Sequence, residues 1–354
     1  MDILNMRRMQ QQIDRGFAPL LRGLRSRYGF ERLSAYAASQ FEQFGLRRGN
    51  RVRSVIMLLS YLGYSGKRLT PELCSWASSL ELIQNFILIH DDIIDNASLR
   101  RGGPSLHISL NRQLGVTDGG KVGRDIAMII GDIFYSAGID LFISIRQAPQ
   151  RKEKALAELM QAAVATGCGE INELLLDMAD INYITKADIF KTYDLKTARY
   201  TFITPLLLGA ILGGAPAADM KTLERIGLLC GRAFQIRDDI AELLSPEKES
   251  QKTFLADFKA SKKTILLWYF LQKAGSRDCR LCCDIFSRKR KTRAELKIIK
   301  NLFFSYGVAI DGEKEIQRMV RSSLRAVERL SSSPAAKSAL AEIIKIIAVT
   351  GETV

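Results

Sequence analysis

The sequence contains few histidines and few prolines, and each shortage excludes a class of protein. Its 354 residues include only two histidines, His90 and His107, so one chain cannot build a multi-histidine metal cage. Only 8 prolines, beside 47% hydrophobic and 25% charged residues, exclude a largely disordered chain. The longest uncharged stretch, 200–218, contains two prolines and several glycines, so we interpret it as a buried helix rather than a membrane span.

The six cysteines are scattered except for Cys279, Cys282 and Cys283, and the N-terminal stretch lacks the apolar region of a secretory signal. We therefore expect reduced thiols and a cytoplasmic protein. The Cys-x-x-Cys-Cys spacing resembles half of a zinc site. No further cysteine or histidine lies nearby in the sequence to complete tetrahedral ligation, which argues against zinc.

Positive charge is in excess and is concentrated in two segments. The chain has 52 Lys+Arg against 38 Asp+Glu, a formal net charge of +14. Residues 1–53 contain eleven arginines and four acidic residues, and residues 276–300 contain nine basic and three acidic residues. Such an excess indicates an anionic partner, which is a nucleic acid, an acidic membrane surface or a polyphosphate substrate. Composition alone does not choose among them.

Apolar residues recur with helical period over most long segments, whereas the alternation and turn dipeptides of β-hairpins are absent. No stretch resembles an interdomain linker. These patterns predict an all-α protein of about ten or more helices in a single bundle domain over residues 1–354. The clearest helical segments are 72–95, 155–178, 181–204, 223–244 and 264–273, and the breaks fall at 63–70, 101–120, 147–151, 213–219, 245–253 and 331–335.

Two acidic clusters occur on apolar predicted helices. Asp91 and Asp95 are four residues apart, so their carboxylates lie on one helix face, where like charges need a compensating cation. Mg²⁺ fits, because it binds through one or two carboxylates and takes further oxygens from substrate phosphates. Asp238 and Glu242 repeat the spacing, with Asp239 between them. Arginines that follow the first cluster suit phosphate oxygens.

These two acidic clusters, together with other motifs along the chain, resemble those of the trans-isoprenyl diphosphate synthases, which elongate prenyl chains head to tail. The similarity is collinear from about residue 49 to 264. HDDIIDNASLRRGGPSLH (90–107) resembles the family's first aspartate-rich motif with its Arg-Arg-Gly, and FQIRDDIAE (234–242) resembles the second. RGNRVR (48–53), GDIF (131–134), LKTA (195–198) and DFKASKKT (257–264) also follow the family order.

The resemblance implies an isoprenoid synthase fold around a deep central cavity, a homodimer, and a Mg²⁺-dependent transferase that condenses isopentenyl diphosphate with an allylic diphosphate. It places Asp91 and Asp95 on two metal ions, and Asp238, supported by Asp239, on a third. By the same resemblance, Thr197 and Gln235 line the reacting carbon. The allylic diphosphate would be held by Arg100, Lys196, Lys252 and Lys262, and the isopentenyl diphosphate by Arg51, Arg53, Arg101 and Gln84.

This chemistry needs no histidine, serine or cysteine nucleophile, which agrees with the shortage of histidine. Diphosphate leaves an allylic carbon dissociatively, so metals and cations stabilise the leaving oxygens and an apolar tunnel keeps the carbocation from water. The isopentenyl double bond then attacks, and a proton is lost. A nucleic-acid partner is not expected, whereas transient contact with a membrane surface is compatible with a lipophilic product.

Several positions depart from the family pattern. Asn50 stands where the family usually has a lysine that binds isopentenyl diphosphate, and Gln84 stands where many members have histidine. Glu170 replaces the glutamine of a Gly-Gln pair, Gln251 replaces a glycine, and Glu242 replaces the last aspartate of the second motif. These departures leave metal and allylic binding intact and bear mainly on the isopentenyl site.

Product length is set in the family by the residues four and five positions before the first aspartate, here Ile87 and Phe86. A bulky aromatic residue there resembles short-chain enzymes, so we predict a C20 product, with C15 next. On an ideal helix Ile87 lies below Asp91 whereas Phe86 turns aside, so this assignment rests on the resemblance. Three alternatives remain, namely a non-catalytic subunit of a heteromeric synthase, a class I terpene cyclase, and a module that binds nucleic acid or membrane.

Overall fold

The computed structural model describes residues 3–29, 35–47, 49–115, 120–245 and 255–350. The backbone forms two compact units. The first runs to Leu156 and includes Gly209–Gly214, and the second comprises Ala157–Leu208 and Ala215–Thr353. The division falls inside two helices, α8 (Pro149–Met178) and α10 (Thr204–Gly213). The single domain expected over residues 1–354 stays a prediction.

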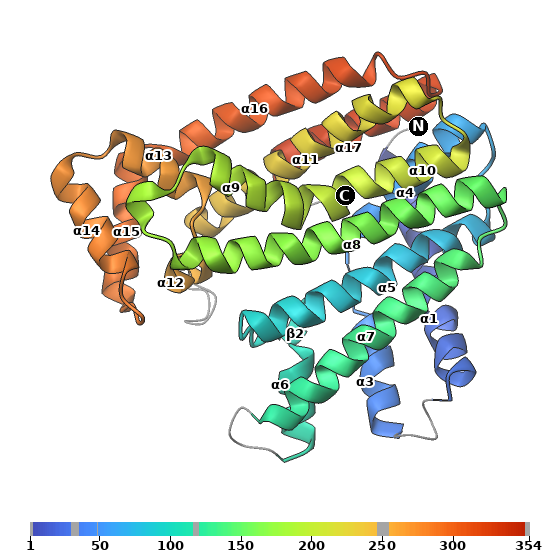
Figure 1. The fold of residues 1–354 in the computed structure, drawn as a ribbon, viewed down its shortest axis with the longest axis horizontal. Helices are drawn as coiled ribbons and strands as arrows, with labels where there is room; N and C mark the ends of the chain where they lie inside the picture. Colours follow the sequence, from blue (N-terminus) through green and yellow to red (C-terminus); the bar gives the residue numbers. More distant parts are fainter. Residues whose placement is uncertain (1–2, 30–34, 48, 116–119, 246–254, 351–354) are drawn as a thin grey trace. The chain divides into compact units, whose positions relative to one another are not determined.

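The first unit consists of helices packed around one long central helix, with a small hairpin (Figure 1). Its elements are α1 (Ile3–Arg27), α3 (Ala35–Gly45), α4 (Val52–Ser65), α5 (Pro71–Ile94), β1 (Leu99–Arg100), β2 (Gly103–Pro104), α6 (Leu106–Gln113) and α7 (Lys121–Ile143). The central helix is α5, which packs against α1, α4 and α7.

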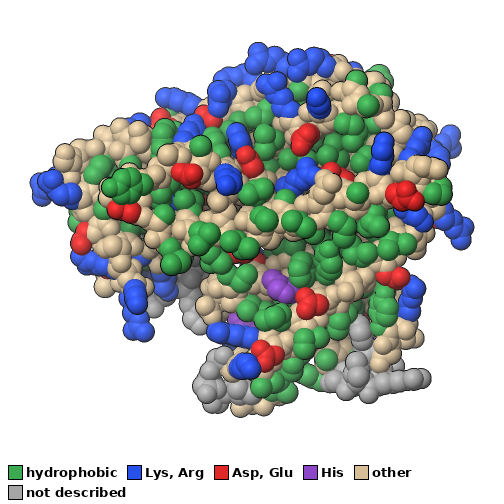
Figure 2. All heavy atoms as spheres, viewed as in Figure 1, with side chains coloured by type: hydrophobic (Ala, Val, Ile, Leu, Met, Phe, Trp, Pro, Cys, Tyr) green, Lys and Arg blue, Asp and Glu red, His purple; other side chains and the backbone are tan. Residues whose placement is uncertain are grey.

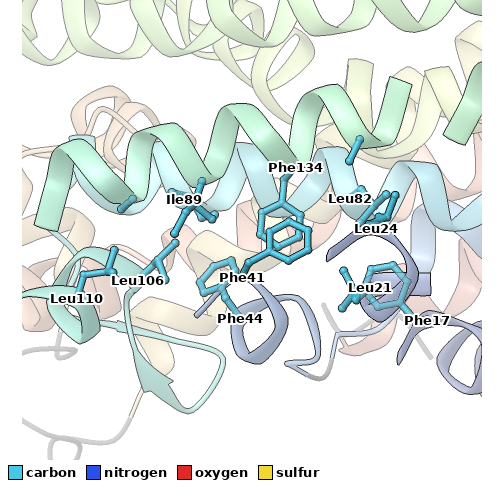
Figure 3. Close-up of a cluster of buried hydrophobic side chains, with 13 residues drawn as sticks. Phe17, Leu21, Leu24, Phe41, Phe44, Leu82, Ile89, Leu106, Leu110 and Phe134 are labelled. Atoms are coloured by element: carbon cyan, nitrogen blue, oxygen red, sulfur yellow. The ribbon is translucent and has the colours of Figure 1, made fainter. Parts of the chain in front are cut away.

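Aromatic and aliphatic side chains fill the core of this unit (Figure 3). Phe41 of α3 stacks on Phe134 of α7 with ring centroids 4.2 Å apart, and Phe44 approaches the same ring at 6.4 Å. Such pairs contribute about 0.5–1.5 kcal/mol beyond the area that they bury. Leu82 and Ile89, seven residues apart on one face of α5, point into the same cluster. This packing fixes the rotation of α5 and therefore the direction of its polar residues.

The boundaries of α5 follow from its sequence. Thr70 is the N-cap, and its hydroxyl accepts the Leu73 N–H at 3.2 Å. Pro71 follows at the first helical position, where its missing N–H costs nothing. The helix ends at Ile94, with Asp95 as its C-cap. The segment 72–95 was predicted to be helical, and the structure confirms this.

A β-hairpin with strands of two residues each follows α5, although the sequence carries no hairpin signal. β1 and β2 pair antiparallel with Leu99 opposite Pro104. The turn between them has Arg101 at φ 49° and Gly102 at φ 74°. Two successive positive φ values are typical of a type I′ turn, which a glycine permits at little cost. The predicted break at 101–120 was too long, because α6 lies within it.

The second unit is also helical, and α11 lies at its centre, packed against η2 and α16. The segment η2 is a π-helix, a rare element often found at functional sites. Gly231 of α11 allows close packing, because a Cβ there would lie 2.3 Å from the Ala198 Cα of η2. The elements are η1 (Ile181–Tyr183), α9 (Lys186–Thr192), η2 (Tyr193–Ile203), α11 (Ala217–Leu244), α12 (Ala256–Ala260), α13 (Ile265–Lys273), α14 (Ser276–Phe286), α15 (Arg293–Ser305), α16 (Val308–Val327) and α17 (Pro334–Thr350).

The all-α class is confirmed, with well over ten helices in the described chain. The helix expected from residue 181 begins only at Lys186, after the 3₁₀ turn η1, because Thr185 caps α9 in a capping box with Asp188. The uncharged run 200–218 is mostly buried, as predicted. One described helix, α7, is long and apolar enough to cross a bilayer by length and composition alone.

Candidate active site

The first acidic motif ends α5 and is bound by an arginine from the hairpin. Asp91 and Asp92 lie on the last turn of α5, and the N–H of Asp95 donates to the Asp91 carbonyl at 2.9 Å. Arg100 of β1 donates from Nε to Asp92 Oδ1 at 2.7 Å and from Nη2 to Asp91 Oδ2 at 2.9 Å. The hairpin therefore brings Arg100 to the motif, while Asp95 stays exposed at the helix end.

Asp92 is the buried carboxylate of this motif, and sequence reasoning did not single it out. It is 1% exposed, and burial raises its pKa to about 6 although Arg100 lowers it. Its Oδ2 atom has no hydrogen-bond partner among the described residues. A buried, unpartnered carboxylate oxygen is unfavourable and fits a site that accepts a cation.

A cluster of arginines lies beside the middle of α5, around one buried glutamate. Arg51 donates from Nη1 to Glu81 Oε2 at 3.1 Å. The burial of Glu81 favours its neutral form, whereas the charges of Arg51 and Arg53 favour the ionised form. Burial alone would raise the pKa of Glu81, but the arginines outweigh it and lower that pKa below its ordinary value. Arg101 donates to Asn85 Oδ1 at 3.4 Å, and burial lowers its pKa to about 10. Concentrated positive charge of this kind suits an anion.

The residues predicted to bind isopentenyl diphosphate differ in how far their polar atoms are already hydrogen-bonded within the protein. Arg51 is 4% exposed and also bonded to the exposed Asp14 at 2.8 Å, so its guanidinium is committed to two carboxylates of the chain. Gln84 is 5% exposed, and its Oε1 atom has no hydrogen-bond partner among the residues that the structure describes. Gly49 lies against Arg101, because a Cβ there would be 2.9 Å from Nη2. Arg101 and Gln84 therefore offer more for a ligand than Arg51 does.

The two predicted chain-length residues occupy one turn of α5. The Phe86 ring lies 4.5 Å from the His90 ring and 5.0 Å from the Tyr135 ring of α7. Phe86 thus packs toward α7 and the core cluster, while Ile87 is half-buried beside it. His90 fits because Gly131 leaves room for its ring. The role of Phe86 and Ile87 in setting product length stays a prediction.

The second acidic motif, on α11, gathers carboxylates that disfavour one another's charge. Asp238 is exposed to solvent on one side. Desolvation by the protein around it, and secondly the negative charge of Asp257, raise its pKa to about 7. Asp239 is 3% exposed, and burial raises its pKa to about 8. Burial and Asp257 also raise the pKa of Glu242, which accepts the Asp257 N–H at 2.7 Å. Without a bound cation these groups favour protonation, as expected for a cation site.

A hydrogen-bond chain links η2 to this motif. Thr197 Oγ1 donates to Gln235 Oε1 at 2.8 Å, and Gln235 Nε2 donates to Asp239 Oδ1 at 3.2 Å. The predicted pair Thr197 and Gln235 is therefore brought together with Asp239. Tyr193, which the sequence did not reveal, donates its hydroxyl proton to Asp239 Oδ2 and accepts the Ile265 N–H at 3.0 Å. The π-helix places Tyr193 and Thr197 on the same side, toward α11.

The predicted lysines of the second unit pair with carboxylates of α8. Lys196 Nζ lies 2.8 Å from Glu170 Oε2 and also bonds to Glu173, while Lys262 Nζ lies 3.8 Å from Glu173 Oε1. Gly169 permits this approach, because a Cβ there would be 2.6 Å from the Lys196 backbone nitrogen. Glu170, noted as a departure from the family glutamine, is thus one of the partners of Lys196.

Metal binding is not prearranged within the protein alone. Among the described residues, no group of three or more histidine, cysteine, aspartate or glutamate side chains is placed to hold an ion by itself. The carboxylates Asp91, Asp95, Asp238 and Asp239 are nevertheless the oxygen donors that Mg²⁺ prefers, and Mg²⁺ often takes its remaining oxygens from substrate phosphates and water. Lys252, also predicted to hold the allylic diphosphate, lies outside the described residues.

A groove of about 540 Å³ lies on α1 and is lined by Arg7, Arg8, Gln11, Gln12 and Arg15. None of the predicted site residues lines it. It is a basic surface feature of the first unit, separate in sequence from both acidic motifs.

Comparison with known proteins identifies the family. The polyprenyl synthetase profile matches residues 37–303, more than half of the chain. The chain belongs to the polyprenyl synthetase family. This confirms the resemblance seen in the motifs. The protein is 27% identical over 303 residues to the geranylfarnesyl diphosphate synthase of Aeropyrum pernix, covering 84% of this chain and 88% of that one. It is 28% identical over 263 residues to the geranylgeranyl diphosphate synthase of Sulfolobus acidocaldarius, covering 73% and 74%.

The fold of this polyprenyl synthetase has close counterparts among solved structures. The structure of geranylgeranyl pyrophosphate synthase from Corynebacterium glutamicum, complexed with isoprenyl diphosphate and magnesium, superposes with a TM-score of 0.88. The alignment covers 99% of this chain and 100% of that one at 20% identity. The enzyme from Pyrococcus horikoshii gives a TM-score of 0.80 at 23% identity, covering 97% and 98%. At 20% and 23% identity, these structural similarities establish the fold alone.

Proposed function

We propose that this polyprenyl synthetase joins isopentenyl diphosphate to an allylic diphosphate head to tail and releases inorganic diphosphate. The observation that carries the proposal is the ordered second motif, in which Thr197, Gln235 and Tyr193 fix Asp239 beside Asp238. The related geranylgeranyl and geranylfarnesyl synthases support the substrate class. The comparisons lend no support to a non-catalytic subunit or a terpene cyclase.

In the reaction, the allylic carbon–oxygen bond breaks, the isopentenyl double bond forms the new carbon–carbon bond, and a proton passes to the released diphosphate. Lys196 and Lys262 balance the negative charge that develops on the leaving oxygens. Bound Mg²⁺ supplies Lewis-acid stabilisation of the same oxygens. Arg101 and Arg53 hold the second diphosphate by charge and guanidinium forks.

We also propose that Asp91 and Asp95 hold two metal ions and that Asp238 with Asp239 holds a third. The unpartnered Asp92 Oδ2 and the raised pKa values of Asp238 and Asp239 support cation sites at both motifs. The protein has six free cysteines, which supports the proposal of a cytoplasmic location.

A homodimer is proposed from two exposed apolar stripes, one in each unit. On α7, Val122 and Ile129 are 51% and 59% exposed. On α8, Val164, Ile171 and Met178 recur every seven residues and are 67%, 59% and 84% exposed. Hydrophobic side chains gather over α8 in Figure 2. Extended apolar surfaces of this kind are uncommon on monomers and typical of interfaces.

The proposed activity is tested by Asp91→Asn and Asp238→Asn. Each change removes a negative charge from one motif while keeping its shape, and we expect turnover to fall by at least about a hundredfold. Asp125→Asn, at an exposed site on α7, is the matched control and should retain wild-type turnover. Formation of prenyl diphosphate from isopentenyl and farnesyl diphosphates is measured at saturating Mg²⁺. Unchanged turnover in both motif variants would contradict the proposal.

A further inference from the structure

The basic segment 287–300 takes no part in either motif, yet it holds seven lysines and arginines against one glutamate. It comprises the loop between α14 and α15, the orange helices of Figure 1, and the first part of α15. A charged segment of this kind is usually a solvated surface or an anion-binding patch. The structure shows instead that two of its lysines turn inward and bind backbone.

Lys291 uses all three of its ammonium donors within the protein. Its Nζ donates to the Lys259 carbonyl at 3.3 Å, to the Arg288 carbonyl at 3.0 Å and to the Ser261 hydroxyl. The ammonium also lies 5.9 Å from the centre of the Phe286 ring. Because a lysine has three donors, Lys291 has none left over for an anion. Its acceptors Lys259 and Ser261 belong to the end of α12.

The turn after α12 needs such support. Ser261 has φ 64°, a left-handed conformation that is unfavourable for residues with a side chain. Its hydroxyl donates to the Phe286 carbonyl at 2.8 Å, and the Lys262 N–H donates to the Asp257 carbonyl at 2.8 Å. The Ser261 hydroxyl thus bridges α14 and Lys291.

The same turn is tied to α8 on its other side. Lys263 Nζ donates to the Asp177 carbonyl at 2.8 Å, and the Lys263 N–H donates to Asp177 Oδ1 at 3.2 Å. Lys262, between these anchors, points to Glu173 of α8 at 3.8 Å. The position of the Lys262 ammonium therefore depends on a turn that Lys291 and Lys263 hold from opposite sides.

A second lysine of the basic segment makes a similar contact. Lys300 of α15 donates to the Ser245 carbonyl at 2.6 Å, at the C-cap of α11. Lysine at a helix C-terminus is favourable, because it satisfies a carbonyl that has no partner in the helix. The helix capped in this way carries the second acidic motif.

We propose that the basic segment is an internal clamp, in which Lys291 is a positioning residue that fixes the Ser261 turn and through it the Lys262 ammonium. This inference rests on the proposed function, in which Lys262 grips the allylic diphosphate. It assigns no contact between Lys291 and substrate. Lys300 anchors the same segment at the end of α11.

The test replaces Lys291 with methionine, which keeps the length of the side chain and removes its donors. We expect KM for the allylic diphosphate to rise about tenfold while KM for isopentenyl diphosphate changes less than about twofold. Lys289→Met is the matched control, because Lys289 is exposed in the same loop. Lys291→Gln, which keeps donors, should restore part of the loss.

A double-mutant cycle with Lys262→Ala separates positioning from general damage. If Lys291 acts through Lys262, Lys291→Met adds little to the allylic KM once Lys262 is alanine. Full additivity, or an equal rise in both KM values, would overturn the inference.

Hydrogen exchange provides a readout that does not depend on activity. Amides of 259–263 should exchange faster in Lys291→Met than in wild type or Lys289→Met. If wild type shows no prenyl transfer but this exchange pattern appears, the clamp stands and the proposed function fails. If exchange at 259–263 is unchanged, the clamp fails whatever the activity.

Discussion

Glu81 lies fully buried beside Arg51, and its Oε1 atom accepts the Ser54 hydroxyl at 2.8 Å. Nothing in its sequence position distinguishes it from the apolar residues around it, except that a lone carboxylate inside an apolar helix needs a partner. That requirement could have pointed to the arginines of 51–53. The partner itself depends on how α4 packs on α5, which a single sequence does not reveal.

The acid response of the first unit follows from this pair. The pKa of Glu81 is lower in the folded than in the unfolded chain, so its stabilising effect is complete above an unfolded pKa of about 4.3 and is lost as pH falls through the lower folded value. The free energy of unfolding of wild type, measured with urea, should therefore fall steeply below about pH 4.3.

Glu81→Gln is the informative variant for that experiment. It removes one of the two carboxylates that Arg51 bonds and leaves Asp14 as the other, so we expect a loss of about 3 kcal/mol at pH 7. Its remaining stability should fall less steeply in acid than that of wild type. Glu153→Gln, at an exposed position on α8, should behave as wild type. Identical acid slopes for Glu81→Gln and wild type would refute the assignment.

Phe86 tests the prediction on product length. Its ring fills space against Tyr135 and His90, so Phe86→Ala opens room beside α5. If Phe86 limits the growing chain, the variant makes products longer than the C20 expected for wild type. Leu88→Ala, also packed against the core, controls for a general loss of packing. Chromatography of the dephosphorylated alcohols measures the length, and an unchanged product shows that the chain-length assignment is wrong.

Among the elements, the long periodic helices were predictable and the short special conformations were not. The helical period and the Thr-Pro start define α5, and α11 is likewise clear from its apolar spacing. The hairpin depends on positive φ at Arg101 and Gly102, and a lone Arg-Gly pair gives no strong turn signal. The π-helix η2 has no recognised sequence pattern here, so the link from Tyr193 to Asp239 could not be foreseen.

Close packing of α11 on η2 yields a prediction about glycine. In Gly231→Ala the new Cβ would lie 2.3 Å from Ala198, so the helices must separate. We expect a loss of about 1–3 kcal/mol in the free energy of unfolding, together with weaker turnover because Thr197 and Gln235 move apart. Gly167→Ala is the matched control in α8, where a Cβ meets nothing within 4 Å, and should be neutral or stabilising by up to about 1 kcal/mol. Equal stability of the two variants would refute the packing argument.

For the whole molecule, the family and the all-α fold could be derived from the ordered motifs, because each motif is local in sequence. The partners of the motif residues come from elsewhere in the chain and needed the structure. Arg100 on Asp91 and Lys196 on Glu170 are examples, since neither pairing follows from spacing. The basic segment was unexplained by sequence for the same reason, because two of the three acceptors of Lys291, on Lys259 and Ser261, lie about thirty residues earlier.

The proposed homodimer predicts a change of mass with a single substitution. Ile171→Lys puts a charge into the exposed apolar stripe of α8, which an interface would have to bury. We expect wild type to have the mass of two chains by light scattering and Ile171→Lys to shift toward one. Gln317→Lys, at an exposed position on α16 rather than on α8, should remain dimeric. A monomeric wild type, or a dimeric Ile171→Lys, would contradict the proposed interface.

The central claim is prenyl transfer with chain elongation by this chain alone. The most direct measurement incubates the purified protein with Mg²⁺, isopentenyl diphosphate and, in turn, dimethylallyl, geranyl and farnesyl diphosphates, and identifies the products by mass. The account predicts elongation from at least one primer, with a C20 diphosphate as the main product. No product from any of the three primers would contradict it.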